Sequence, residues 1–457
     1  MRALSFLDRD HTVAPAGYTR WLIPPAALAI HLCIGQVYAT SVYKDVLVQH
    51  FDTSLTAIGF IFSIAIVMLG VSAALFGTWV DRVGPRRTMF TAACCWSAGF
   101  LVAALGIGTE QLWLVYLGYG VIGGIGLGLG YISPVSTLIK WFPDRPGLAT
   151  GMAIMGFGGG AMVAAPLSRE LLARFGGAHP DGDAVMKLFL TLGVAYFVVM
   201  MFGVFTVRVP ATGWTPAGFD PATIAARPMV TTASVSAANA IKTPQFWLLW
   251  TVLLCNVTAG IGILEQAAEM IQDFFRDAAD PATSAVTAVV AAGFVGLLSL
   301  ANMGGRLAWS TASDYLGRKN TYVMYLGVGI VLYVLLATVG SRSTPLFVVL
   351  CAVIISYYGG GFATAPAYLR DLFGTYQVGA IHGRLLTAWS TAGVLGPVIV
   401  NGVLDSREAR SVGGGSEVLL AGDYRPALYI MVGVLAVGFV ANLLIRPVAE
   451  RFHEEIA

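Results

Sequence analysis

The sequence predicts an all-α integral membrane protein with twelve transmembrane helices. Three features predict it: the composition, a series of long apolar runs, and a likeness between the two halves of the chain. Of the 457 residues, 57% are hydrophobic and only 11% carry a charged side chain. Because soluble globular chains carry about 25% charged residues, this chain lacks the charges that the surfaces of several soluble domains would need. Most of its surface is therefore expected to face lipid.

Twelve runs are long enough to cross a bilayer, for which a helix needs about 20 apolar residues. Each run is continuous and not alternating, which excludes a transmembrane β-barrel. The predicted spans are residues 22–44, 55–80, 88–107, 112–138, 148–167, 187–207, 245–267, 286–311, 321–340, 345–368, 384–404 and 425–445.

Lysine and arginine residues predict the orientation of these spans, because cytoplasmic loops carry an excess of both. The two termini and the even-numbered connections hold 17 of the 27. The odd-numbered connections and their edges hold nine, and the one that remains is Arg306. The chain is therefore expected to be a multi-pass protein of the cell inner (plasma) membrane, with the N- and C-termini in the cytoplasm.

Polar stretches predict how the spans are grouped. The longest, residues 208–244, is rich in Pro, Ser, Thr and Ala without apolar periodicity, which is typical of a linker. It predicts an N-terminal six-helix bundle at 1–207, a cytoplasmic linker at 208–244 and a C-terminal six-helix bundle at 245–457. A second polar insertion, at about 405–425 between the last two spans, is expected to be a mobile outer loop.

Several other classes of function are not favoured. A net charge of +2 leaves no basic stripe for nucleic acid, and five cysteines in apolar runs lack metal-ligand spacing. No nucleotide-binding pattern lies between a strand and a helix, and no paired nucleophile and base lies inside the spans. We expect no enzymatic activity, no cofactor and no metal. The expected partners are membrane lipid and a small substrate, with a monomer as the functional form.

The two halves share a motif after their second span. The first copy reads GTWVDRVGPRR and the second reads STASDYLGRKN. The first Asp and Gly map onto the second pair with one common shift of 233 residues, which indicates an internal repeat. The candidate gating residues are Asp81, Gly84 and Arg86 in the first copy and Asp314, Gly317 and Arg318 in the second.

The chemistry of this motif suits a moving contact. Glycine permits a tight turn between two spans, and the basic residues anchor the loop on the cytoplasmic side. The Asp can hold the amides at a helix end or a neighbouring Arg. Such a contact can form in one state of a carrier and break in the other, whereas the alternative is a purely structural turn.

These loops and the six-plus-six arrangement resemble the major facilitator superfamily, whose two halves are related and hold the substrate near the midplane. Within it, residues 126–160, 243–250 and 302–318 are similar to the oxalate/formate antiporter group. The resemblance implies a secondary transporter of small organic anions that works by alternating access. It covers nearly the whole chain.

Arg306 lies eight positions before Asp314, or about 12 Å along an α-helix, and therefore near the middle of the membrane. A cation there costs roughly 2.5–3.5 kcal/mol on insertion scales, so it must face a wet cavity or a partner. A guanidinium can hold a carboxylate through two parallel hydrogen bonds, and the resemblance implies this role. The alternative is bonding to backbone carbonyls or to a loop. The polar residues on the same helix face are Ser299, Asn302, Ser310 and Ser313.

Aromatic residues on the spans that line the path in this family complete the predicted substrate site. The resemblance implies cavity positions for three tyrosines. For each aromatic residue taken alone, ordinary helix packing is expected about as often as contact with a ligand. The candidates are Tyr38, Tyr131, Tyr358 and Phe362. His31 is a possible protonation site, although a lone histidine in a helix is more often a packing residue.

Two departures from the family pattern bear on the substrate. Trp389 occupies the place of a second cation, a lysine, in the oxalate exchanger of the group, and one buried cation balances a monoanion. Asn302 occupies a place where proton-coupled monocarboxylate carriers often have an acid, which argues against proton coupling through that pair. Both positions are counted among the candidate substrate-binding residues.

The sequence therefore predicts a secondary active transporter of small carboxylates, with a monocarboxylate favoured, driven by anion exchange or proton symport. One alternative is an oxalate:formate-type dicarboxylate antiporter. Another is a carboxylate sensor of the same fold that does not transport. An exporter of lipophilic cations would need an acid in the cavity, and the span interiors contain none.

Overall fold

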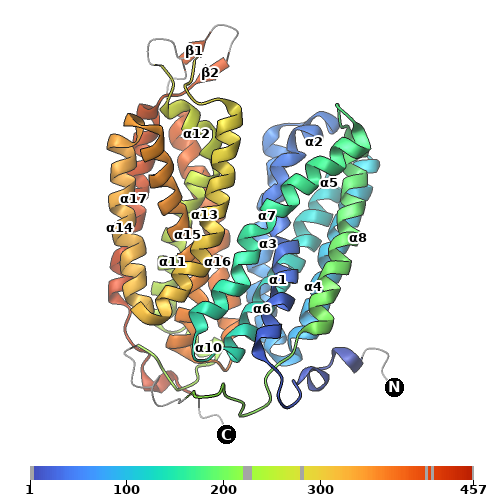
Figure 1. Cartoon of the computed structure of the whole chain (residues 1–457), viewed down its shortest axis with the longest axis vertical. Coiled ribbons are helices and arrows are strands. Elements are labelled where there is room, and N and C mark those ends of the chain that lie inside the picture. Colours follow the sequence, from blue (N-terminus) through green and yellow to red (C-terminus); the bar gives the residue numbers. More distant parts are fainter. Residues whose placement is uncertain (1–4, 220–228, 278–282, 407–409, 413–415, 455–457) are drawn as a thin grey trace. The chain divides into compact units, whose positions relative to one another are not determined.

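The structure is a computed structural model that describes residues 5–219, 229–277, 283–406, 410–412 and 416–454. Within these residues, twelve helical spans are long and apolar enough to cross a membrane, and Figure 1 shows them as coiled ribbons. Their exposed faces carry large apolar side chains such as Leu75 (70% exposed) and Val289 (81% exposed), as expected of surfaces that face lipid. The predicted all-α fold of six plus six spans is confirmed.

The chain forms two compact units. The N-terminal unit comprises Met1–Phe246, Pro366–Ser390 and Arg446–Ala457, and the C-terminal unit comprises Trp247–Ala365 and Thr391–Ile445. The piece Pro366–Ser390, here called the 366–390 segment, therefore packs with the first half of the chain although it lies in the second. Its N-terminal boundary coincides with Pro366, a proline inside a helix that weakens the helix ladder there.

The N-terminal unit contains the first six spans. The first span is α1 (Ile23–Ile34) between two 3₁₀ segments, η3 (Arg20–Leu22) and η4 (Gly35–Val42), and the fourth contains a π-helical stretch, η5 (Tyr116–Gly123). The remaining helices are α2 (Lys44–His50), α3 (Leu55–Val83), α4 (Pro85–Gly108), α5 (Leu112–Val115), α6 (Gly124–Trp141), α7 (Pro146–Gly176), α8 (Gly182–Thr206) and α10 (Ala237–Ala240). Short 3₁₀ segments η1 (Ser5–Leu7), η2 (Arg9–Thr12) and η7 (Glu450–Phe452) also belong to this unit, as does the 366–390 segment.

The second half of the chain contributes the other six spans and two short strands. The helices are α11 (Pro244–Glu265), α12 (Ala267–Phe274), α13 (Ala288–Leu316), α14 (Arg318–Val339), η6 (Gly340–Arg342), α15 (Thr344–Phe373), α16 (Val378–Asp405) and α17 (Ala421–Leu444). The strands β1 (Arg410–Val412) and β2 (Ser416–Val418) pair antiparallel in the insertion that the sequence predicts to be a mobile loop. They lie beyond the ends of the helices of the C-terminal unit (Figure 1, top).

Two helices differ most from the predicted spans. Helix α7 continues to Gly176, nine residues past its predicted end, through the polar residues Arg169 and Glu170. Helix α16 starts at Val378, six residues before its predicted start. In both cases the apolar run marks only the part of a helix that matches the hydrocarbon core, and the helix continues into polar surroundings.

Glycines allow α13 and α15 to pack closely. A Cβ atom at Gly305 of α13 would overlap the backbone carbonyl of Ser356 on α15, and a Cβ at Gly360 would lie 2.7 Å from Cβ of Trp309. Small residues permit this close approach of membrane helices. The neighbouring Gly304 faces open space, with nothing within 4 Å of the point where a Cβ would lie.

The two adjacent glycines provide a matched test of this packing. We expect Gly305→Ala to lower the thermal unfolding temperature of the detergent-purified protein, because overpacking a close helix contact costs about 1–3 kcal/mol. Gly304→Ala is the control and is expected to leave the unfolding temperature nearly unchanged. Equal effects of the two substitutions would contradict the close α13–α15 contact.

Candidate functional site

Arg306 is completely buried in the structure. Its side chain projects from the middle of α13, has an exposed fraction of 0%, and belongs to a stripe with the buried residues Asn302, Ser310 and Ser313. Nε of Arg306 donates a hydrogen bond to Oδ1 of Asn302, one helical turn earlier, at 3.0 Å. This bond helps to fix the direction of the guanidinium plane, so Asn302 orients the arginine.

An aromatic ring covers the guanidinium from a second helix. The central carbon of the Arg306 guanidinium lies 5.1 Å from the ring centroid of Phe362 on α15, within the range of a cation–π contact. A Cβ at Gly359 would overlap the Asn302 backbone carbonyl and would lie 3.2 Å from Cγ of Arg306. Glycine at 359 therefore leaves the space that the Arg306 side chain and the Asn302 backbone occupy.

The glycine run 359–361 brings a third helix to the same region. A Cβ at Gly361 would overlap the amide group of Asn256 on α11, and the carbonyl of Gly361 accepts a hydrogen bond from Tyr322 at 2.5 Å. Tyr358 is buried, and its ring packs against Gly260 of α11. Four of the predicted site residues, Arg306, Asn302, Tyr358 and Phe362, thus lie on two packed helices of the C-terminal unit.

The other three predicted site residues gather in the N-terminal unit around Phe157. The ring centroids of Tyr38, Tyr131 and Trp389 lie 5.2, 5.4 and 6.1 Å from that of Phe157. Tyr131, Phe157 and Trp389 are buried and Tyr38 is half-buried. Trp389 joins this cluster because it belongs to the 366–390 segment.

Both copies of the loop motif turn at a glycine in the left-handed region. Gly84 has φ of +86° and Gly317 has φ of +80°, values that residues with a side chain rarely adopt. Each of these glycines ends one span and is followed at once by the next helix. Both glycines thus have the backbone geometry of a tight turn between two spans.

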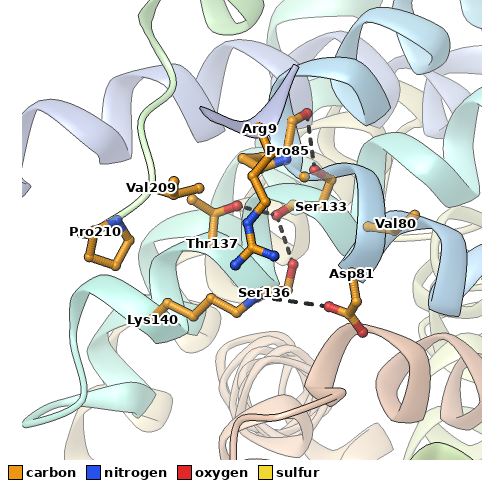
Figure 2. A pocket seen from close by; sticks show the side chains of 11 residues that line it. Arg9, Val80, Asp81, Pro85, Ser133, Ser136, Thr137, Lys140, Val209 and Pro210 are labelled. Atoms are coloured by element: carbon orange, nitrogen blue, oxygen red, sulfur yellow. Dashed lines mark hydrogen bonds and ion pairs between the residues drawn. The ribbon is translucent and has the colours of Figure 1, made fainter. Parts of the chain in front are cut away.

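Asp81, in the first copy, caps a helix from the second half of the chain. Its Oδ2 accepts a hydrogen bond from the backbone N–H of Ala380 at 2.9 Å, in the first turn of α16. Its Oδ1 lies 3.9 Å from Nζ of Lys140 on α6. Asp81, Lys140 and Arg9 line a pocket together with hydroxyl residues of α6 (Figure 2).

The arginines of the two motifs differ in what they bind. Arg86 donates hydrogen bonds to four backbone carbonyls, among them those of Phe6 at 2.8 Å and Val204 at 3.2 Å. Arg318 instead forms an ion pair with Asp314 at 2.6 Å. The sequence left open whether the Asp holds helix amides or an Arg: Asp81 accepts from a helix amide, and Asp314, among its contacts, pairs with an arginine.

Three residues of these clusters were not singled out from the sequence. Phe157 lies in a glycine-rich run that predicts helix packing, Asn256 is a lone amide in α11, and Lys140 was counted as a topology charge. Their significance depends on neighbours that are distant in the sequence. The one local signal that could have indicated them is a polar or aromatic residue inside or at the end of a glycine-containing span.

Comparisons with known proteins agree with this architecture. The family model described as Major Facilitator Superfamily matches residues 26–397. The chain is 25% identical to the oxalate:formate antiporter of Oxalobacter formigenes over 82% of this chain and 83% of that protein. It is 26% identical to apicoplast pyruvate carrier 1 of Toxoplasma gondii, over 68% of this chain and 62% of that one. Among solved structures, the E. coli fucose:proton symporter shares the fold, with a TM-score of 0.65, 14% identity, and coverage of 93% of this chain and 99% of that one.

The Asp81 cap can be tested without a substrate. We expect Asp81→Ala to speed backbone hydrogen exchange of the first turn of α16 by about fivefold, because a helix cap contributes about 1 kcal/mol. Peptide-resolved mass spectrometry over residues 378–384 measures this exchange. Asp314→Ala, which removes the equivalent carboxylate of the second copy, is the control. If it accelerates the same peptide as strongly, the cap assignment is wrong.

Proposed function

Because the chain belongs to the major facilitator superfamily, we propose that it is a secondary active transporter of small carboxylates that works by alternating access. The similarity to an oxalate:formate antiporter and to a pyruvate carrier supports this substrate class. Both of these proteins carry small organic anions by name. In this proposal the chain crosses the inner membrane of the cell, and both termini lie in the cytoplasm.

The buried Arg306 is the observation that carries the proposal. Burial of a cation inside a membrane span is costly unless an opposite charge or polar partners compensate for it. The Nε bond of Arg306 goes to a neutral amide and the face of its guanidinium meets an aromatic ring, and both contacts orient the cation. A bound carboxylate would add the opposite charge and can meet the guanidinium fork with two parallel hydrogen bonds.

The aromatic surroundings favour a small monoanion. Trp389, and not a second cation, lies with Tyr38 and Tyr131 around Phe157 in the N-terminal unit. A single arginine balances one negative charge, whereas a dianion would bring a second charge without a matching cation. We therefore favour a monocarboxylate over oxalate as the cargo. The dicarboxylate exchange suggested by the name of one relative is the alternative.

The driving force is either exchange for a second anion or symport with a proton. Neither requires a nucleotide or a metal. A sensor that binds a carboxylate without moving it would share the same arginine site, so uptake into vesicles is the property that distinguishes a carrier from a sensor.

The first test replaces the arginine. In liposomes that contain the purified protein, wild type is expected to take up a labelled monocarboxylate faster when unlabelled carboxylate is trapped inside. Arg306→Gln should lower this uptake at least about a hundredfold, because charge-assisted bonds contribute about 1.5–3 kcal/mol each. Arg306→Lys keeps the positive charge but loses the paired N–H donors of the guanidinium. Its uptake rate is expected to lie between those of wild type and Arg306→Gln.

The control for this test is Arg342→Gln, which removes an exposed arginine of η6. It should transport at the wild-type rate. Normal uptake by a well-folded Arg306→Gln protein would show that Arg306 is not the substrate anchor.

The second test concerns selectivity. We expect Trp389→Lys to shift the ratio of oxalate to formate uptake upward by about tenfold, because it adds a second cation for the second carboxylate. Trp389→Met removes the indole without adding charge and serves as the control. An unchanged ratio in the lysine variant would remove the charge argument for a monocarboxylate.

A further inference from the structure

Two buried histidines flank one tyrosine in the N-terminal unit. The ring of Tyr131 on α6 contacts His31 of α1 at 5.4 Å and His382 of α16 at 5.6 Å between centroids. The exposed fractions of His31, Tyr131 and His382 are 0, 0 and 2%. We propose that these three residues form a proton-binding site that holds the 366–390 segment in place while both imidazoles are neutral and releases it when one of them binds a proton.

The position of His382 links the cluster to the contact between the 366–390 segment and helices α1, α3 and α6. His382 lies in the 366–390 segment, four residues into α16 and next to Gly383, where a Cβ would overlap the backbone of Ala73 on α3. Farther along the same helix, Ser390 donates a hydrogen bond to the carbonyl of Ile66 on α3 at 2.8 Å. If this segment moves away from α1, α3 and α6, His382 leaves the protein interior for a more polar environment.

The hydrogen bonding of His31 defines where a proton would bind. Its Nδ1 lies 3.1 Å from the carbonyl oxygen of Ala27. Because a carbonyl only accepts, Nδ1 carries the hydrogen of the neutral ring and Nε2 is the basic nitrogen. A second proton would therefore bind at Nε2 and give the whole ring a positive charge.

No acid neutralises His382 within the part of the chain that the structure describes, where it takes part in no ion pair. Three charged groups on the elements that pack nearby bind other partners. Asp81 of α3 accepts from Ala380 and lies near Lys140 of α6. Arg384 of α16 donates to the carbonyl of Ala237, and Arg370 of α15 pairs with Asp371.

The burial of both imidazole rings determines whether acid favours the packed or the separated state of the 366–390 segment. A buried imidazolium loses hydration, and a positive charge on one ring repels a positive charge on the other. In water an imidazole has a pKa near 6.5. The separated state therefore binds protons that the packed state excludes, and acidification below about pH 6.5 favours separation.

This inference extends the proposed function, because a proton that is bound in one state and excluded in the other can couple transport to a proton gradient. It also offers another site for proton coupling. Asn302 stands where proton-coupled relatives often have an acid next to the arginine, whereas the two histidines belong to the N-terminal unit.

A thiol-labelling experiment tests the switch without requiring transport. The five native cysteines are replaced by alanine, and Ser390→Cys is introduced as a reporter that is buried while α16 packs on α3. The rate of maleimide labelling of this reporter is measured at pH 7.5 and 5.5. At each pH it is divided by the labelling rate of a Tyr376→Cys protein, whose reporter replaces a residue that is 47% exposed. This ratio removes the effect of pH on the thiol itself. We expect it to rise up to about tenfold on acidification, given an imidazole pKa near 6.5 in the separated state.

Variants of the histidines identify the site. His31→Gln and His382→Gln should each reduce the rise markedly, whereas His179→Gln, at an exposed loop position, should retain it. A parent protein whose ratio does not change with pH would overturn the inference, and so would histidine variants that respond like the parent.

Carboxylate exchange by the same parent protein in liposomes is measured separately. Loss of exchange with an intact labelling response would contradict the proposed function but not the histidine switch. Intact exchange without a labelling response would contradict the switch alone.

Discussion

The guanidinium of Arg306, buried within a membrane span, is the constraint around which the C-terminal unit is arranged. Placing a cation at that depth costs several kcal/mol unless the surroundings compensate. An amide one turn earlier on α13 orients it and Phe362 on α15 covers it. Both contacts are neutral: they fix the direction of the cation, and a bound carboxylate would supply the opposite charge. A rigid, oriented cation of this kind is what selective carboxylate binding requires.

Close helix packing makes this arrangement possible. The backbone of α15 approaches α13 and α11 at the glycines 359–361 and at Gly305. A side chain at Gly359 would occupy the place of the Asn302 backbone, so the glycine run and the arginine site depend on one another. The same principle operates in the N-terminal unit, where Gly35 on η4 and Gly160 on α7 meet so closely that neither has room for a Cβ. Glycine spacing in this protein therefore positions the side chains of the proposed site as well as allowing helices to pack closely.

Much of the fold was predictable from the sequence, because apolar length and charge bias act locally along the chain. The number of spans, the repeat and the buried Arg306 follow from such local signals. The cap of Asp81 on α16, the grouping around Phe157 and the contact of His382 with Tyr131 do not, since each joins residues that are distant in the sequence. The packing of residues 366–390 with the first half of the chain was also not predicted, because their apolar pattern is the same as that of any other span.

The most direct test of the central claim is calorimetric titration of the purified protein with small monocarboxylates and with their primary amides, which have nearly the same shape but no charge. If Arg306 anchors the cargo, a carboxylate such as formate, lactate or pyruvate will bind saturably while its amide will not, and Arg306→Gln will abolish the binding. Equal binding of the carboxylate and its amide, or unchanged binding in the variant, would contradict the account.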